Sequence, residues 1–191
     1  PIQLDLSGSV SADSFADLTK IVENNQVAFG NQYTWSSYNP TTRKVIYTQK
    51  ADKLTIMDGS SQIIFTINAN DQVVSYEQIY AGSVQVLGKE RELITAQKAV
   101  EILYLAGRIN SKATVQSVKL SYYQSLVLKD FSIYSPAWYI EIRQADGQLI
   151  ARRVDAIHGT VLANETLETT NTQTQRTTTN NTTTTQSVQQ Q

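Results

Sequence analysis

Cysteine is missing from this chain of 191 residues, and histidine occurs only once. Without thiolates, the chain cannot form a disulfide framework, a zinc–thiolate site, an iron–sulfur cluster or a cysteine nucleophile. A single histidine also excludes any metal site that is built from several imidazoles. We therefore predict no metal site and no cofactor.

The chain also lacks an excess of charge of either sign. Sixteen Lys and Arg residues stand against seventeen Asp and Glu residues, which gives a formal net charge of -1. This balance provides no positive field for a nucleic acid or for an anionic lipid surface. We predict that the protein binds no nucleic acid.

Long apolar runs are absent from the sequence as well. No stretch approaches the roughly 18 consecutive apolar residues that a membrane-spanning helix needs. The first residues, PIQLDL, have neither the basic start nor the apolar run of a signal peptide. Because the chain does not begin with Met, we expect that a preceding segment has been trimmed from it. Hydrophobic residues still make up 40% of the chain, which is enough for a core.

The first half of the sequence has the pattern of one helix followed by strands. Residues 11–24 predict a helix, and its apolar stripe is made of Phe15, Leu18, Ile21 and Val22. Polar pairs at 58–59 and 70–71 suit tight turns between strands. Strands are predicted at 27–38, 44–49, 53–57, 62–68 and 73–80.

The second half repeats this pattern. A helix is predicted at 95–106, with Thr95 as its N-cap and Gly107 just beyond its end. Pro136 is placed at the start of a strand, where its missing N–H does least harm. The buried face of the helix is expected to hold Ala96, Ala99, Val100, Leu103 and Tyr104. Further strands are predicted at 118–123, 138–143 and 148–157.

These patterns predict an α+β fold of two tandem lobes, each an antiparallel sheet that carries one packed helix. The N-terminal lobe is placed at 1–82, a linker at 83–92 and the C-terminal lobe at 93–168. Residues 169–191 consist almost entirely of Thr, Gln and Asn. Such a segment has too little apolar surface to offset the entropy of ordering, so we predict a disordered tail.

Residues that could carry catalysis are few. His158 lies three residues after Asp155, but no nucleophile is evident beside this pair. Glu77, Glu101 and Glu141 are candidate carboxylates for hydrolysis, although their residue type alone does not indicate a reaction. We predict that the protein is not an enzyme and has no catalytic residue.

The chain contains ten tyrosines. Several lie on predicted strands, and ordinary packing on a sheet is one interpretation of them. Exposed aromatic side chains on a sheet also suit a protein–protein interface. The residues that we predict to contact a partner are Tyr76, Tyr80, Tyr122 and Tyr123.

Several segments together resemble the YycI (WalI) family. These are VSYEQIY at 74–80, ELITAQKAVEILY at 92–104, VKLSYY at 118–123, SPAWYI at 135–140 and VDAIHG at 154–159. Ser121 stands where the family often has Gly, and the Thr/Asn/Gln tail departs from its pattern. The likeness is close from Gln62 to Leu162 and looser over residues 1–60.

The resemblance implies a regulator of the YycF–YycG (WalR–WalK) two-component system, which controls cell-wall metabolism in Gram-positive bacteria. It implies a YycH-type protein and the YycG sensor kinase as partners. It also implies a single membrane-spanning helix before Pro1, which would place the present domain on the extracytoplasmic side of the cell membrane. The second lobe looks like PepSY and cystatin-like folds.

Two other functions remain open. A PepSY-like or cystatin-like peptidase inhibitor needs a protruding apolar turn, and the turns at 58–59 and 146–147 are too polar for that role. A wall-active hydrolase needs a carboxylate with a raised pKa in a cleft. We expect a regulator first, an inhibitor second and an enzyme last.

Overall fold

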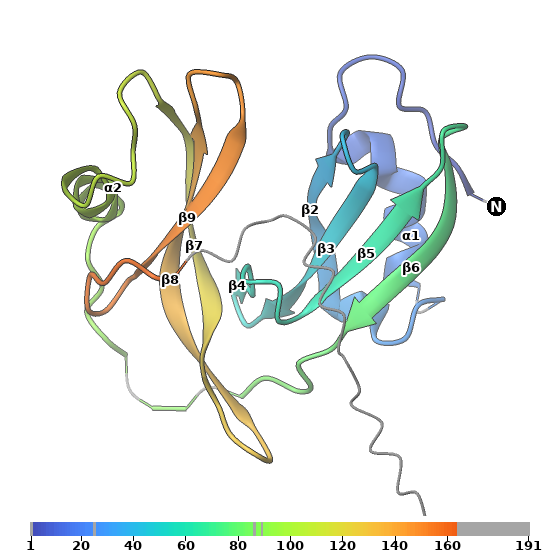
Figure 1. The fold of residues 1–191 in the computed structure, drawn as a ribbon. Helices are drawn as coiled ribbons and strands as arrows, with labels where there is room; N and C mark the ends of the chain where they lie inside the picture. The colour runs from blue at the N-terminus through green and yellow to red at the C-terminus, as the bar shows by residue number, and fades with distance from the viewer. Residues whose placement is uncertain (1, 25, 86, 89, 164–191) are drawn as a thin grey trace, which may run out of the picture.

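The computed structural model describes residues 2–24, 26–85, 87–88 and 90–163, which form two lobes side by side (Figure 1). Each lobe contains an antiparallel sheet and one α-helix, so the predicted α+β fold is confirmed. The tail predicted at 169–191 lies outside the described residues. None of the described helices is long and apolar enough to cross a membrane.

The N-terminal lobe is a six-stranded sheet covered on one face by a helix. Its strands run in the order β1-β6-β5-β3-β2, and β4 pairs with β3 away from this path. A 3-10 turn leads directly into the helix α1. The elements are β1 (Ile2–Gln3), the turn (Ala12–Phe15), α1 (Ala16–Glu23), β2 (Tyr33–Asn39), β3 (Lys44–Ala51), β4 (Leu54–Thr55), β5 (Gln62–Ile67) and β6 (Gln72–Ile79).

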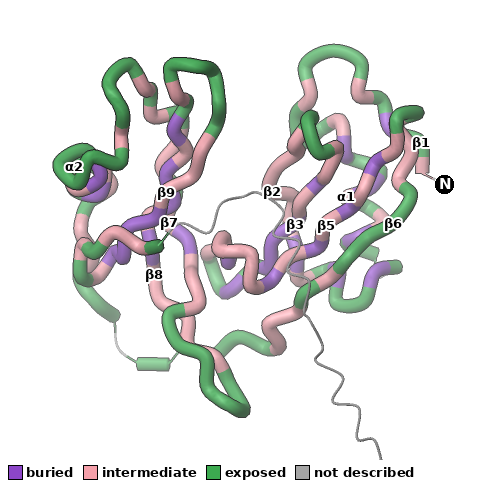
Figure 2. Tube along the Cα trace, viewed as in Figure 1, coloured by how far each residue is buried: buried purple, intermediate pink, exposed green. Residues whose placement is uncertain are grey.

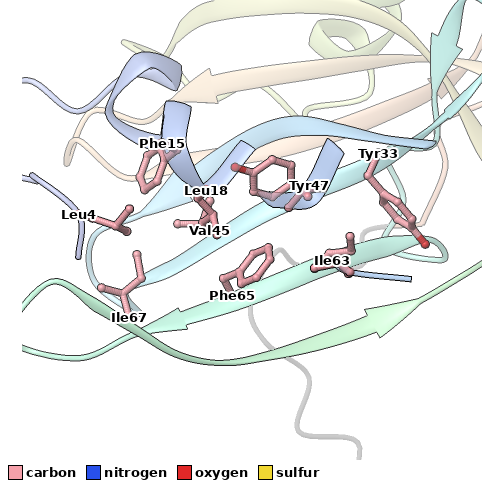
Figure 3. Packing of buried hydrophobic residues seen from close by; sticks show 11 residues of the cluster. Leu4, Phe15, Leu18, Tyr33, Val45, Tyr47, Ile63, Phe65 and Ile67 are labelled. Atoms are coloured by element: carbon pink, nitrogen blue, oxygen red, sulfur yellow. The ribbon is translucent and has the colours of Figure 1, made fainter. Parts of the chain in front are cut away.

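The core of this lobe lies between α1 and the inner face of the sheet (Figure 3). Alternate residues of β3 and β5 point inward, because successive side chains of a strand face opposite sides. Of the predicted helix stripe, Phe15, Leu18 and Val22 are at 0% exposure, whereas Ile21 is half-buried. The ring of Phe15 lies 6.2 Å from Trp35 and 5.4 Å from Tyr38 between centroids.

The C-terminal lobe is a three-stranded sheet with α2 against one face. Its strands run in the order β7-β8-β9, so β8 is central. The elements are α2 (Ala96–Leu105), β7 (Thr114–Val127), β8 (Ser132–Arg143) and β9 (Leu149–Asp155).

The helix α2 begins as the sequence predicts. The Thr95 hydroxyl accepts a hydrogen bond from the Lys98 N–H at 3.1 Å, which satisfies a free amide of the first turn. Ala99 and Leu103 are fully buried against the sheet. Tyr104, predicted on this face, is instead 67% exposed. A ten-residue helix on a narrow sheet buries only a narrow stripe, and Tyr104 falls outside it.

The strand predicted at 27–38 is wrong in its first part, because β2 begins only at Tyr33. The preceding residues form a loop in which Phe29 has a left-handed backbone, with φ of 56°. The loop then passes so close to α1 that a Cβ on Gly30 would lie 2.0 Å from the Val22 carbonyl oxygen. Only glycine allows this approach, which turns the chain before the strand starts.

Pro136 lies inside β8 rather than at its start, so that expectation is also wrong. Its carbonyl accepts a hydrogen bond from the Ala156 N–H at 2.9 Å, beyond the last residue of β9. The nitrogen of Pro136 points to this same side, where the ladder between β8 and β9 ends at Ala137. The N–H that Pro136 lacks is therefore not needed for any hydrogen bond of the ladder between β8 and β9.

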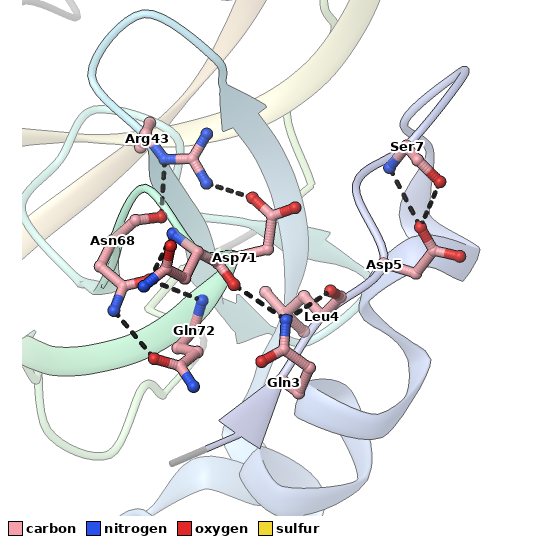
Figure 4. A network of polar contacts seen from close by, with 9 residues as sticks. Gln3, Leu4, Asp5, Ser7, Arg43, Asn68, Asp71 and Gln72 are labelled. Atoms are coloured by element: carbon pink, nitrogen blue, oxygen red, sulfur yellow. Dashed lines mark hydrogen bonds and ion pairs between the residues drawn. The ribbon is translucent and has the colours of Figure 1, made fainter.

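Polar contacts hold β1 against the start of β6 (Figure 4). The Leu4 N–H donates to the Asp71 carbonyl, and the Gln3 side chain donates to the Asn70 carbonyl, both at 2.9 Å. Arg43 forms an ion pair with the Asp71 carboxylate. The turn before β6 thus fixes the first strand of the lobe.

Candidate partner-binding surfaces

The two lobes are joined by direct contacts that involve Tyr122. After β4, Ile56 forms a parallel backbone bridge with Tyr122, and the Met57 N–H donates to the Tyr122 carbonyl at 3.0 Å. The Asp58 carboxylate accepts a hydrogen bond from the Gln124 N–H. Tyr122 is half-buried. This predicted partner-contact residue therefore lies at the junction between the lobes.

The face of the C-terminal sheet opposite α2 takes part in the same junction. The guanidinium of Arg153 donates to the Met57 carbonyl at 3.0 Å and lies 6.0 Å from the centre of the Tyr139 ring. Some buried apolar residues of the protein belong to neither lobe's core cluster. They are Ala51, Ile56, Ala137, Tyr139 and Ala156.

Tyr123 is engaged inside the C-terminal lobe. Its hydroxyl donates to the Asp155 carboxylate at 2.7 Å, and that carboxylate also accepts the Ile157 and His158 N–H groups at 2.8 and 2.6 Å. Burial, together with the nearby Asp155 charge, raises the pKa of Tyr123 to about 12. Burial alone would raise the pKa of Asp155, but hydrogen bonds from the His158 amide, the Tyr123 hydroxyl and the Ile157 amide hold it below its usual value.

This arrangement makes Asp155 a structural carboxylate. Its side chain is 7% exposed, whereas that of His158 is 72% exposed and stands 3.2 Å away through Nδ1. The pair closes the turn after β9. Among the described residues, no hydroxyl nucleophile is hydrogen-bonded to the imidazole of His158.

We expect Asp155→Asn to destabilise the protein by about 1.5–3 kcal/mol at pH 7, the usual range for hydrogen bonds to a charged group. Because the pKa of Asp155 is lowered in the folded state, its contribution is present above the unfolded pKa of about 3.9 and is lost as the pH falls below it. Urea unfolding at pH 7 and at pH 3 measures the difference. A difference between the two proteins that does not shrink at pH 3 would contradict this role.

The candidate carboxylates are not brought together. Glu77 lies on β6, Glu101 on α2 and Glu141 on β8. Glu101 forms an exposed ion pair with Lys98 at 3.1 Å, and Glu141 accepts the hydroxyl of Ser117. No two of them face one another across a cleft, so they do not form the carboxylate pair of a glycosidase.

Tyr76 and Tyr80 lie at the rim of the N-terminal core, where Tyr76 is exposed and Tyr80 is half-buried. Tyr76 is 47% exposed and its ring packs on Phe65 at 5.5 Å between centroids. Tyr80 stacks on Phe29 at 4.3 Å with the two rings 7° from parallel, and its hydroxyl donates to Gln32 at 3.1 Å. We call Phe29, Tyr76 and Tyr80 the aromatic patch. Each ring of the patch stacks on or packs against a neighbouring ring, and those of Phe29 and Tyr76 remain accessible to solvent.

A second apolar surface was missed by the sequence analysis. The long hairpin of β7 and β8 extends past the rest of the C-terminal lobe (Figure 1). Its turn closes with the Leu128 N–H donating to the Phe131 carbonyl at 2.9 Å. We call the exposed apolar residues around this turn the hairpin tip. They are Leu126, Val127, Leu128 and Phe131.

An open pocket of about 510 Å³ lies between the lobes. One side is the edge strand β2, with Trp35 and Tyr38, and the other side carries Lys119 and Glu141. The rings of Trp35 and Tyr38 pack against Phe15 of the N-terminal core, so they contribute to this core as well as to the pocket wall.

Comparison with known families identifies the class of protein. A sequence model of the YycI protein family matches residues 1–157, which span the N-terminal lobe, α2 and all three strands of the second sheet. The chain therefore belongs to the YycI family, as its motifs predict. This is a family of membrane-associated regulators, and its role is linked to the YycFG two-component system. A search of curated proteins gave no match.

Proposed function

We propose that this protein is an extracytoplasmic accessory regulator that is anchored in the cell membrane by a helix preceding the present chain. It binds a YycH-type protein and modulates the YycG sensor kinase, and through it cell-wall metabolism. The observation that carries the proposal is the aromatic patch of a chain that belongs to a regulatory family. Ordered, accessible aromatic rings are the side chains that concentrate binding energy at interfaces.

The charge balance supports the same function. With a formal net charge of -1, the domain has little long-range field to steer an association. Binding would then depend on apolar contacts and change little with salt. Two proteins that are anchored in one membrane meet at a high effective concentration, so a micromolar affinity between the isolated domains is sufficient.

The experiment mixes the purified domain with the extracytoplasmic domain of a YycH-type protein and measures the Kd at low and high salt. We expect Tyr76→Ala to weaken binding by about tenfold, equal to roughly 1.4 kcal/mol. Tyr104→Ala is the matched control, because Tyr104 is also exposed but lies on α2 of the other lobe. Absence of binding at high micromolar concentration would contradict the proposal, and so would equal losses in the two variants.

The hairpin tip favours one alternative, a peptidase inhibitor. A protruding apolar turn is the feature such an inhibitor would insert into a protease cleft, and Phe131 at this turn is 56% exposed. Phe131→Asp separates the two functions when a peptidase-inhibition assay accompanies the binding experiment. A regulator that binds through the aromatic patch keeps its affinity in this variant, whereas inhibition of a peptidase would be lost.

A further inference from the structure

The strand β6 forms an edge of the N-terminal sheet that is only partly covered. Within the described part of the chain, β1 is the one strand on this edge, and it pairs with Gln72 and Val73 only. The following residues, 74–77, are all exposed. Figure 2 shows β6 exposed along most of its length, whereas β5 beside it is partly buried.

The hydrogen bonds of Ile79 show which backbone groups of β6 point outward. The Ile79 carbonyl accepts the hydroxyls of Tyr33 at 2.8 Å and Ser61 at 3.2 Å, and both donors come from the inner side of the lobe. The N–H and C=O of one strand residue point to the same side, and the side alternates along the strand. The backbone groups of Tyr76 and Gln78 therefore point away from β5, along the open edge.

We propose that this edge of β6, residues 74–79, binds an extended strand of the partner protein. The proposal rests on the function proposed above and specifies how the partner binds. The N–H and C=O groups of Tyr76 and Gln78 can form hydrogen bonds with the main chain of an added strand, which would become the next strand of the sheet. The aromatic patch flanks this edge, so it receives the side chains that the added strand turns toward α1.

The charge on β6 favours a different chain over a second copy of this one. Glu77 is the only charged residue of the strand. If two copies paired antiparallel through the outward groups of both Tyr76 and Gln78, each Glu77 would lie directly opposite the other. Like charges in that position destabilise a strand pair, whereas a Lys or Arg opposite Glu77 stabilises it. The occupant is therefore a strand that carries apolar residues and one basic residue.

The test compares Gln78→Pro with Gln78→Ala in binding to the same YycH-type domain. Both changes remove the side-chain hydrogen bond from Gln78 to the Ala28 carbonyl, which measures 2.6 Å. Only proline removes the outward N–H, and it leaves the ladder to β5 intact. We expect Gln78→Pro to bind at least about tenfold more weakly than Gln78→Ala. Hydrogen exchange on the unmodified chain adds a second readout, in which the Tyr76 and Gln78 amides become protected when the partner is added.

The outcomes separate this inference from the proposed function. Binding that is equal in the two variants, without new protection on β6, would overturn the strand addition and leave the proposed function standing. Protection of the same amides in the chain alone, together with a dimer in solution, would make a second copy the occupant and overturn the inference too. No binding by the unmodified chain would contradict the proposed function, and the inference would fall with it.

Discussion

Trp138→Ala is expected to lower the free energy of unfolding by about 3–4 kcal/mol, the lower part of the usual range for truncating a large aromatic residue, because Trp138 is half-buried against the core cluster. Trp138 lies on the central strand β8 and packs on the same cluster as Ile140, Ile142 and the buried residues of α2. Its indole N–H donates to the Ile94 carbonyl at 2.9 Å, just before the helix begins. The substitution removes both the packing and this hydrogen bond.

Trp138→Phe is the matched control for that substitution. It keeps most of the apolar contact and loses the indole N–H, so we expect a cost of about 1–3 kcal/mol from the unpaired Ile94 carbonyl and the smaller ring. Trp35 then remains as the only tryptophan, since the chain has two, and its fluorescence reports on the N-terminal lobe. Urea unfolding followed by circular dichroism measures both variants. An unchanged midpoint in Trp138→Ala would refute the packing of Trp138 against the core cluster.

Phe15→Ala should cost a similar amount, about 3–5 kcal/mol, but in the other lobe. Phe15 is 0% exposed and its ring packs against the rings of Trp35 and Tyr38. The alanine variant leaves a cavity between the 3-10 turn and β2 that the rigid rings cannot fill by small movements. Thermal and urea unfolding measure the loss.

Phe29→Ala serves as the comparison for Phe15→Ala. The same side chain is removed there, but Phe29 is 53% exposed and stacks on only one ring, that of Tyr80. We expect a loss of less than about 1.5 kcal/mol, in the range of one aromatic pair. Equal losses at the two positions would mean that the core of the N-terminal lobe is not where the structure places it.

Local pattern was sufficient to predict most elements of this fold. The stripe of α1 and the alternation in β5 are periodic, and the cap at Thr95 is a short-range signal. The family could also be predicted, because several short motifs occur along the chain in the order that is typical of YycI proteins. Periodicity does not, however, fix how much of a helix face a neighbouring sheet covers, which is why Tyr104 was placed in the core.

The contacts between the lobes could not be predicted from the sequence. Met57 and Tyr122 are far apart along the chain, and no local pattern marks their hydrogen bond. For the same reason the sequence predicts Tyr122 and Tyr123 as partner-contact residues but does not show that the Tyr122 backbone pairs with Ile56 or that the Tyr123 hydroxyl donates to Asp155. The hairpin tip was missed because Lys129 and Asp130 lack the glycine or asparagine that marks most tight turns.

The segment after β4 covers part of the open edge of the second sheet. The strand β7 lies at the edge of its sheet, and without cover the Tyr122 carbonyl and the Gln124 N–H would be open to strands of other molecules. Met57 and Asp58 occupy these two groups. The edge of the second sheet is thus covered by two residues of the N-terminal lobe, and we expect a fragment cut at the predicted linker to lose this cover and to aggregate more readily.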